Sequence, residues 1–208
     1  MIINKHKVFI SYHHANDQGY KESLLNWNKD NNNDIFIDAS VDTGDIDENL
    51  PDHIIRQKIR DEYLRDSTVT ILLVGTETKN RKHIDWEIFS SMFDGQINKK
   101  SGVLVIQLPS TGCNTYTAAH GEEEKSALYP EVDSWISITK KSDYENRYPY
   151  LPQRIIDNLL KSDVKVSVAN WHTITASPDK LKLVIDLTFK GKESCNYDLS
   201  QQMKRANS

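Results

Sequence analysis

Cysteine, glycine and long apolar runs are all scarce in this chain. Only two of its 208 residues are cysteines and eight are glycines, so a disulfide framework is excluded and a reducing cytoplasm is the expected location. The longest apolar runs, around Val69–Val74 and Val103–Leu108, are far shorter than the roughly 20 residues that span a bilayer. The first residues, MIINKHKVF, lack the apolar region of a signal peptide. We therefore expect a cytoplasmic protein with no membrane partner.

The distribution of charge and of metal-binding side chains excludes two further classes of partner. The chain has 26 Lys and Arg against 30 Asp and Glu, and its basic residues are scattered, which argues against nucleic acid as a partner. The two cysteines are distant from each other, and among the histidines only His13 and His14 are neighbours. Adjacent strand residues point to opposite faces, so no metal site is predicted.

Several enzyme motifs are also missing. No glycine follows the first predicted strand, which excludes a phosphate-binding turn, and no Asp follows the third, which excludes a phospho-receiver. The Gly-x-Ser-x-Gly turn of Ser/His/Asp hydrolases is absent. Cys113 and His120 are a nucleophile and a base in principle, but no third group that would orient them is visible in the sequence.

Apolar residues, in contrast, follow an order that alternates strands with helices. The predicted strands are His6–His13, Asp34–Asp38, Val69–Val74, Val103–Leu108 and Val164–Ala169. Helical spacing of apolar residues is found in the segments 20–27, 52–64, 84–92, 151–160 and 181–189. Five strands that alternate with helices predict a parallel five-stranded sheet in a flavodoxin-like, three-layer α/β domain.

We expect one domain over residues 1–190, with a long insert at about 109–148 and a polar, loose C-terminal tail over 191–208. The insert contains four tyrosines and an acidic run, and a gap of this length is typical of a functional lid, here bordering the ligand cleft. At its end the domain has Ser177 followed by Pro178, which favours a helix. Alternating leucines and isoleucine over 181–187 leave a strand as the competing interpretation.

One acidic residue is singled out by its place in this pattern. Glu87 follows the strand Val69–Val74 in a helix whose apolar residues leave it off the apolar stripe, beside the sheet edge at which α/β proteins bind ligands. An arbitrary helical glutamate is usually a solvated surface residue, so its predicted neighbours matter. Hydroxyl, aromatic and acidic side chains are expected at the same edge: Ser11, Tyr12, His13, Asp38, Ser40 and Thr76.

Three segments carry a resemblance to a known family. VFISYHHAND at 8–17, DIFIDAS at 34–40 and STVTILLVGTETKNRKHIDWEI at 67–88 resemble a bacterial TIR domain, specifically the TIR-like family of the Thoeris anti-phage defence protein ThsB. The resemblance implies NAD+ as a substrate rather than a cofactor, release of nicotinamide, and a cyclic ADP-ribose-type signal that a separate effector protein detects. It makes Glu87 the catalytic glutamate and places Tyr12 and His13 at the nicotinamide end. The acidic loop 39–50 would border the nucleotide.

The chain departs from the family at one aromatic position. TIR enzymes often have a tryptophan four residues before the glutamate, whereas this chain has His83 there and Trp86 directly before Glu87. We keep His83 among the substrate-binding candidates and interpret Trp86 as a packing or interface residue. The resemblance also implies a homo-oligomer whose neighbouring subunit completes the site. Two alternatives remain: a non-catalytic TIR adaptor that acts by self-association, and a nucleoside deoxyribosyltransferase-like enzyme.

Overall fold

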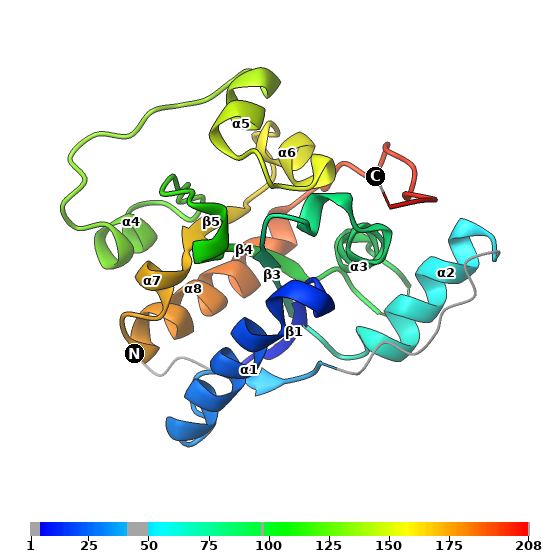
Figure 1. Ribbon diagram of the computed structural model, residues 1–208, viewed down its shortest axis with the longest axis horizontal. Coiled ribbons are helices and arrows are strands. Elements are labelled where there is room, and N and C mark those ends of the chain that lie inside the picture. Colours follow the sequence, from blue (N-terminus) through cyan, green and yellow to red (C-terminus); the bar gives the residue numbers. More distant parts are fainter. Residues whose placement is uncertain (1–4, 41–49, 97, 208) are drawn as a thin grey trace.

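A parallel sheet of five strands forms the centre of the computed structural model, which describes residues 5–40, 50–96 and 98–207 (Figure 1). The strands lie in the order β2-β1-β3-β4-β5, and every pair is parallel. They span Lys7–Ser11 (β1), Ile37–Asp38 (β2), Val69–Val74 (β3), Gly102–Gln107 (β4) and Ser167–Asn170 (β5). This order changes direction between β1 and β3, where flavodoxin-like folds bind ligands. The predicted flavodoxin-like α/β fold is confirmed.

Helices cover both faces of the sheet. The α-helices are α1 His14–Asp30, α2 Asp52–Lys58, α3 Lys82–Met92, α4 Glu122–Leu128, α5 Lys141–Arg147, α6 Gln153–Leu159, α7 Trp171–Ile174 and α8 Pro178–Gly191. A π-helical turn, η1 Ile59–Tyr63, extends α2, and three short 3-10 helices occur at η2 Thr78–Asn80, η3 Pro109–Thr111 and η4 Lys192–Ser194. Together with the sheet they make the three expected layers.

The alternation of side chains along β3 explains which helices lie on which face. Ile71 and Leu73 pack into one cluster with residues of α1, α7 and α8, whereas Leu72 and Val74 pack into a second cluster with α3 and α6. Residues one apart on a strand point to opposite faces. All six residues of β3 are buried, as expected for a central strand that is covered on both sides.

Element boundaries differ from the sequence predictions in several places, and one open alternative is settled. The second strand is only two residues long, and the fifth begins at Ser167 rather than at Val164. The predicted helix over 52–64 ends in the π-helical turn η1. The segment after Ser177 is a helix, since the Ser177 side chain accepts a hydrogen bond from the backbone N–H of Lys180, so the competing strand is wrong.

The prediction of a loose C-terminal tail is wrong. The chain after α8 returns across α3 and α6 and buries Cys195, Tyr197 and Met203 (Figure 1). The backbone carbonyls of Gln201 and Gln202 accept hydrogen bonds from the guanidinium of Arg154. We call residues 195–207 the C-terminal strap. Its composition is polar, but its backbone is held by buried partners, and this is why it is ordered.

The insert 109–148 is largely packed rather than open. Leu128 and Tyr129 join the core cluster on the α1 face, and Tyr148, the last residue of the insert, is fully buried. Thr117 pairs with Val168 through an antiparallel bridge, so this part of the insert extends the sheet beyond β5. Residues 132–140, which lack regular secondary structure, run as a wide arc from α4 to α5 (Figure 1). Most of the insert therefore lies at the β5 edge.

Candidate active site

Glu87 lies against the carboxyl end of the first strand. Ser11, the last residue of β1, donates a hydrogen bond from Oγ to Oε2 of Glu87 over 2.6 Å. Both side chains are nearly inaccessible, at 1% exposure for Ser11 and 7% for Glu87. The interpretation of Glu87 as a solvated surface residue is therefore excluded. A buried carboxylate at this sheet edge requires either a partner or a function, and Ser11 is its partner.

Burial changes the protonation of this carboxyl group. Loss of solvation raises the pKa of Glu87 from 4.5 to about 7, and the hydrogen bond from Ser11 opposes this rise. At neutral pH the group thus exists in both protonation states. Such a pKa is typical of a group that exchanges protons during a reaction.

His13 lies between β1 and α1, close to the charged side chains of Glu77 and Arg81 in the segment that follows β3. Its carbonyl accepts the backbone N–H of Asp17 over 2.8 Å, which starts the helix. Burial lowers the pKa of His13, and the nearby Arg81 lowers it further, whereas Glu77 acts in the opposite direction. Arg81 and Glu77 form a salt bridge of 3.3 Å. Within the described part of the chain, Nδ1 of His13 is buried and has no hydrogen-bond partner, so it is able to accept or donate one.

A second buried carboxylate lies at the same edge and was not predicted. Asp17, in the first turn of α1, is 2% exposed, and burial raises its pKa. A Cβ placed on Gly75, just after β3, would lie 2.5 Å from both carboxylate oxygens, so Asp17 packs directly on this turn. Among the described residues Oδ2 of Asp17 has no hydrogen-bond partner. The sequence signal was weak because a polar residue in a helical first turn is ordinarily solvent-exposed.

Tyr12 has a different environment from the one expected. The residue is 7% exposed and belongs to the core cluster on the α1 face, where its ring stacks on His14 with centroids 4.4 Å apart. The Lys21 ammonium lies 5.3 Å from the same ring. The expected open stacking surface for a ligand is therefore not found at Tyr12.

The three remaining candidates at the strand ends are closer to solvent. Ser40 is half-buried and accepts a hydrogen bond on Oγ from the backbone N–H of Ile10 over 3.2 Å, which brings it beside the end of β1. Asp38 is exposed and accepts the backbone N–H of Ser40. Thr76 is half-buried after β3. Residues 41–49 of the predicted acidic loop lie outside the described residues.

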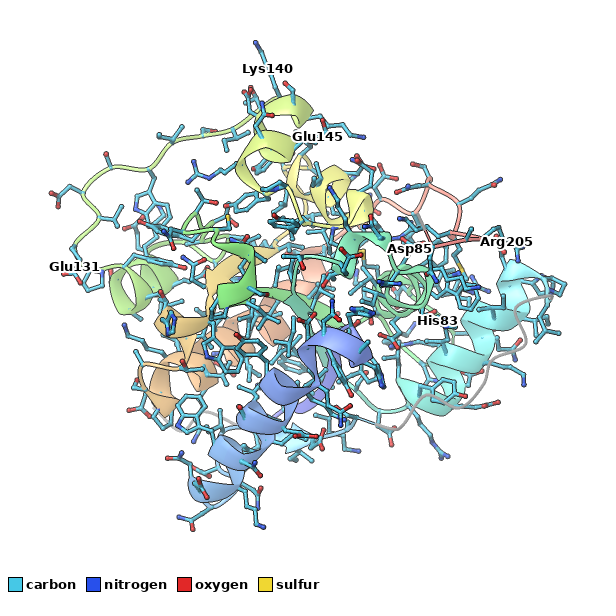
Figure 2. The ribbon with its side chains drawn as sticks, in the orientation of Figure 1. His83, Asp85, Glu131, Lys140, Glu145 and Arg205 are labelled. Carbon is cyan, nitrogen blue, oxygen red and sulfur yellow. The ribbon has the colours of Figure 1, made fainter. Side chains whose placement is uncertain are left out.

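The two aromatic residues before Glu87 have separate environments. His83 is exposed on α3, one helical turn before Glu87 on the same side, and its ring meets Trp86 edge-on at 4.9 Å. Trp86 is 1% exposed and donates its indole N–H to the carbonyl of Lys204 over 2.7 Å. The interpretation of Trp86 as a packing residue is thus confirmed. Figure 2 shows His83 and Asp85 on different sides of α3.

Cys113 and His120, the nucleophile and base considered from the sequence, each contact a different threonine. Cys113 Sγ lies 3.0 Å from Thr115 Oγ1, and His120 Nε2 lies 3.4 Å from Thr188 Oγ1, so each has its own partner. In the described residues there is no group of three or more His, Cys, Asp or Glu side chains able to hold a metal ion. Nor does any helix among them have the length and apolarity needed to cross a membrane.

Comparison with protein families identifies a matching family. Residues 9–112 match the TIR-like domain of the Thoeris protein ThsB. The matched half of the chain includes Ser11 and Glu87 and stops at the start of the insert. No individual curated protein matches the chain. The extent of this match shows that the chain belongs to the TIR-like domain family of the Thoeris protein ThsB.

Proposed function

We propose that this chain cleaves the glycosidic bond between nicotinamide and ribose in NAD+, with Glu87 as the catalytic residue. The observation that carries the proposal is the buried Glu87 carboxylate held by Ser11 at the end of β1. Family membership supports a role in Thoeris anti-phage defence. The product we infer is a cyclic ADP-ribose-type signal for a separate effector protein.

One carboxylate suffices for the bond-breaking step. The pyridinium nitrogen takes the bonding electron pair and nicotinamide leaves as a neutral molecule, so no general acid is required. The ribose carbon becomes an oxocarbenium-like cation, which the ionised form of Glu87 stabilises. A hydroxyl or base nitrogen of the same molecule then bonds to this carbon and gives the cyclic product. If water reacts instead, the product is ADP-ribose.

A hydroxyl acceptor, or water, must lose one proton in this second step, whereas a ring nitrogen bonds through its lone pair and has no proton to lose. With its pKa near 7, the Glu87 carboxylate is suited to take that proton and to return it to solvent. Exclusion of water from the site favours the cyclic product over hydrolysis. The candidate contacts to the substrate are Ser11, His13, Ser40, Thr76 and His83. Asp38, which is exposed, and Tyr12, which packs in the core, are the weaker candidates.

Two expectations about the cellular setting accompany the proposal. Both cysteines of the described chain are unpaired, which suits the reducing cytoplasm. We further expect a homo-oligomer in which a neighbouring subunit completes the nucleotide site. Neither nucleic acid nor a membrane is needed as a partner.

The test is product analysis by chromatography after mixing the purified protein with NAD+, with and without lysate of phage-infected cells. We expect nicotinamide and a cyclic nucleotide from the wild-type protein, and neither from Glu87→Gln. Glu145→Gln, which changes an exposed glutamate on α5, is the matched control and should retain activity. Intact NAD+ in every mixture would favour the adaptor. Transfer between deoxynucleosides with NAD+ untouched would favour the deoxyribosyltransferase-like enzyme.

A further inference from the structure

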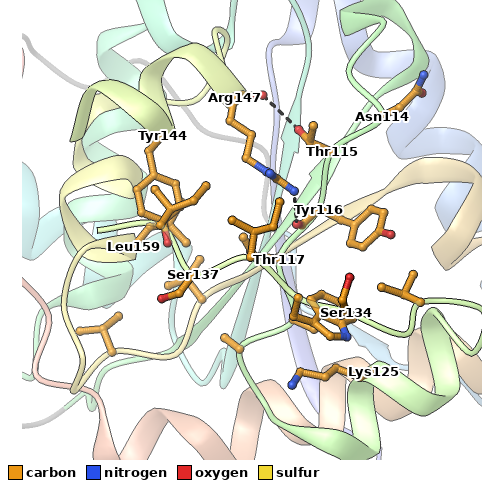
Figure 3. A pocket seen from close by; sticks show the side chains of 18 residues that line it. Asn114, Thr115, Tyr116, Thr117, Lys125, Ser134, Ser137, Tyr144, Arg147 and Leu159 are labelled. Atoms are coloured by element: carbon orange, nitrogen blue, oxygen red, sulfur yellow. Dashed lines mark hydrogen bonds between the residues drawn. The ribbon is translucent and has the colours of Figure 1, made fainter. Parts of the chain in front are cut away.

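A cavity of about 540 Å³ lies under the arc of the insert, beyond β5 (Figure 3). Its walls come from residues 114–119, which run beside β5, from Val132 and residues 134–138 of the arc, and from Arg147 at the end of α5. Two strands, β3 and β4, separate β5 from β1, where Ser11 meets Glu87. The cavity is therefore distinct from the candidate active site. Its volume falls within the range usual for small-molecule sites.

The charge of the cavity wall has a single sign. Among the described residues that line it, Lys125 and Arg147 are cationic and none is an Asp or a Glu. Figure 3 shows the two cations at opposite ends of the cavity. Lys125 also forms an ion pair of 2.8 Å with Glu122, whose side chain is 84% exposed outside the cavity. An anion inside the cavity would thus meet positive charge without a competing carboxylate on the wall.

Arg147 has hydrogen-bonding capacity that the protein does not use. Its Nη2 donates to the carbonyl of Tyr116 over 3.5 Å, which is a long contact. Its Nε is buried and, within the part of the chain that the structure describes, has no partner. A guanidinium offers five N–H donors in a planar fork that matches phosphate or carboxylate oxygens. A half-buried Arg147 whose Nε has no partner among the described residues therefore favours an oxyanion ligand.

An aromatic wall lies beside these cations. Tyr116 stacks on Tyr129 with centroids 3.9 Å apart, and Trp135 meets Tyr116 edge-on at 5.7 Å. The Lys125 ammonium lies 5.3 Å from the centroid of the Trp135 ring. Rings fixed against one another lose little freedom on binding and provide a flat surface for a planar ligand group.

We infer that this cavity binds a nucleoside phosphate, with the phosphate on Arg147 and the base beside Tyr116 and Trp135. The site would bridge the arc and the body of the domain, because Trp135 belongs to the arc and Arg147 to α5. It lies entirely beyond residues 9–112, the segment shared with the family. A ligand here thus contacts only parts of the chain that this match does not cover.

The experiment measures binding of adenosine 5′-monophosphate to Glu87→Gln protein by calorimetry and by tryptophan fluorescence. This protein needs no turnover, so the result does not depend on whether NAD+ is cleaved. We expect saturable binding, and Arg147→Gln should weaken it by about tenfold or more. Arg147→Lys, which keeps the charge but loses the fork, should weaken it less. Lys140→Gln, an exposed change on the arc outside the cavity wall, should leave it unchanged.

Trp135→Phe locates the ligand, because it should abolish the fluorescence change while Trp27, Trp86 and Trp171 remain. Adenosine and inorganic phosphate, tested separately, should each bind more weakly than the nucleotide. Melting temperatures identify variants that lose the fold, and Arg147→Lys then serves in place of Arg147→Gln. The inference is overturned if no binding is found up to about 5 mM nucleotide, or if a folded Arg147 variant binds as tightly as Lys140→Gln.

Discussion

Asp85 and Arg154 form a buried, two-pronged ion pair that joins α3 to α6. Arg154 Nε donates to Asp85 Oδ1 over 2.9 Å, and Nη2 donates to Oδ2 over 3.0 Å. The backbone N–H of Lys204 donates to the same Oδ2, so the C-terminal strap completes the arrangement. Asp85 precedes Glu87 by two residues, and these contacts therefore fix the helix that carries the candidate catalytic group.

Breaking this ion pair should strongly destabilise the fold. Asp85→Asn leaves the Arg154 guanidinium buried without a counter-charge, and the expected loss in the free energy of unfolding is about 3–5 kcal/mol. Urea denaturation measures it. Lys141→Gln is the control, because its pair with Asp157 is partly exposed and should contribute less than about 1 kcal/mol. Equal losses in the two variants would contradict the role given to Asp85.

Replacement of Glu87 by Gln should reduce NAD+ cleavage by roughly 10²–10³, mainly in kcat, because the lost charge stabilises the transition state rather than the bound substrate. In the wild-type protein kcat/KM should rise with pH through about 7, as Glu87 ionises. Ser11→Ala removes the hydrogen bond that lowers this pKa, so the rise should move to higher pH. A profile that is flat from pH 5 to 9, or unmoved by Ser11→Ala, would contradict the assignment.

The same carboxyl group should make stability depend on pH. Its folded-state pKa of about 7 lies above the unfolded value of 4.5, so the folded protein binds the proton more tightly. This contribution to stability is complete below pH 4.5 and is lost as pH rises through 7. Glu87→Gln should therefore be more stable than the wild type by about 3 kcal/mol at pH 8 and similar to it near pH 4. Denaturation at both pH values tests this, and a variant less stable at pH 8 would refute it.

Activity per molecule should increase with protein concentration. The family resemblance implies that a neighbouring subunit completes the nucleotide site, so dilution should remove that contribution. Initial rates measured from nanomolar to micromolar protein test the expectation, with sedimentation at the same concentrations. A specific rate that stays constant while the protein remains monomeric would show that one chain holds a complete site.

Hydrogen exchange should divide the insert into two parts. Tyr144 and Tyr148 are buried, and the backbone N–H of Tyr148 donates a hydrogen bond to the carbonyl of Tyr144 over 2.8 Å. The amides of this helix should therefore be protected. Amides of the arc 132–140, which has no regular secondary structure, should exchange at least about a hundredfold faster. Protection of the arc equal to that of β3 would show that the whole insert is a packed subdomain.

The sheet was predictable because its strands are short apolar runs, and a buried parallel strand leaves few alternatives for such a run. The last helix was also predicted correctly, because Ser177 before Pro178 is a typical helix N-cap. The C-terminal strap was not predictable, because its order depends on partners far away in the chain, such as Arg154 and Trp86, and not on its own polar composition. Local patterns carry no information about these pairings.

The candidate site was predictable only in part, for a related reason. Ser11 ends β1, and Glu87 lies on the helix that follows the neighbouring strand β3, so topology brings them to one sheet edge. Whether Tyr12 faces a ligand or the core depends on side-chain packing under α1, which the sequence does not reveal. Asp17 escaped notice because its burial arises from the close approach of the Gly75 turn. No periodicity marks such an approach.

The C-terminal strap has a consequence for the order in which the protein is made. A ribosome completes α3, with Trp86 and Asp85, more than a hundred residues before it reaches Lys204, whose backbone bonds to both side chains. Until then the indole N–H of Trp86 and Oδ2 of Asp85 lack their hydrogen bonds to the strap. The helix that bears Glu87 thus gains its last contacts late in translation, and a nascent chain interrupted before residue 201 has the Asp85–Arg154 pair but lacks both bonds from Lys204.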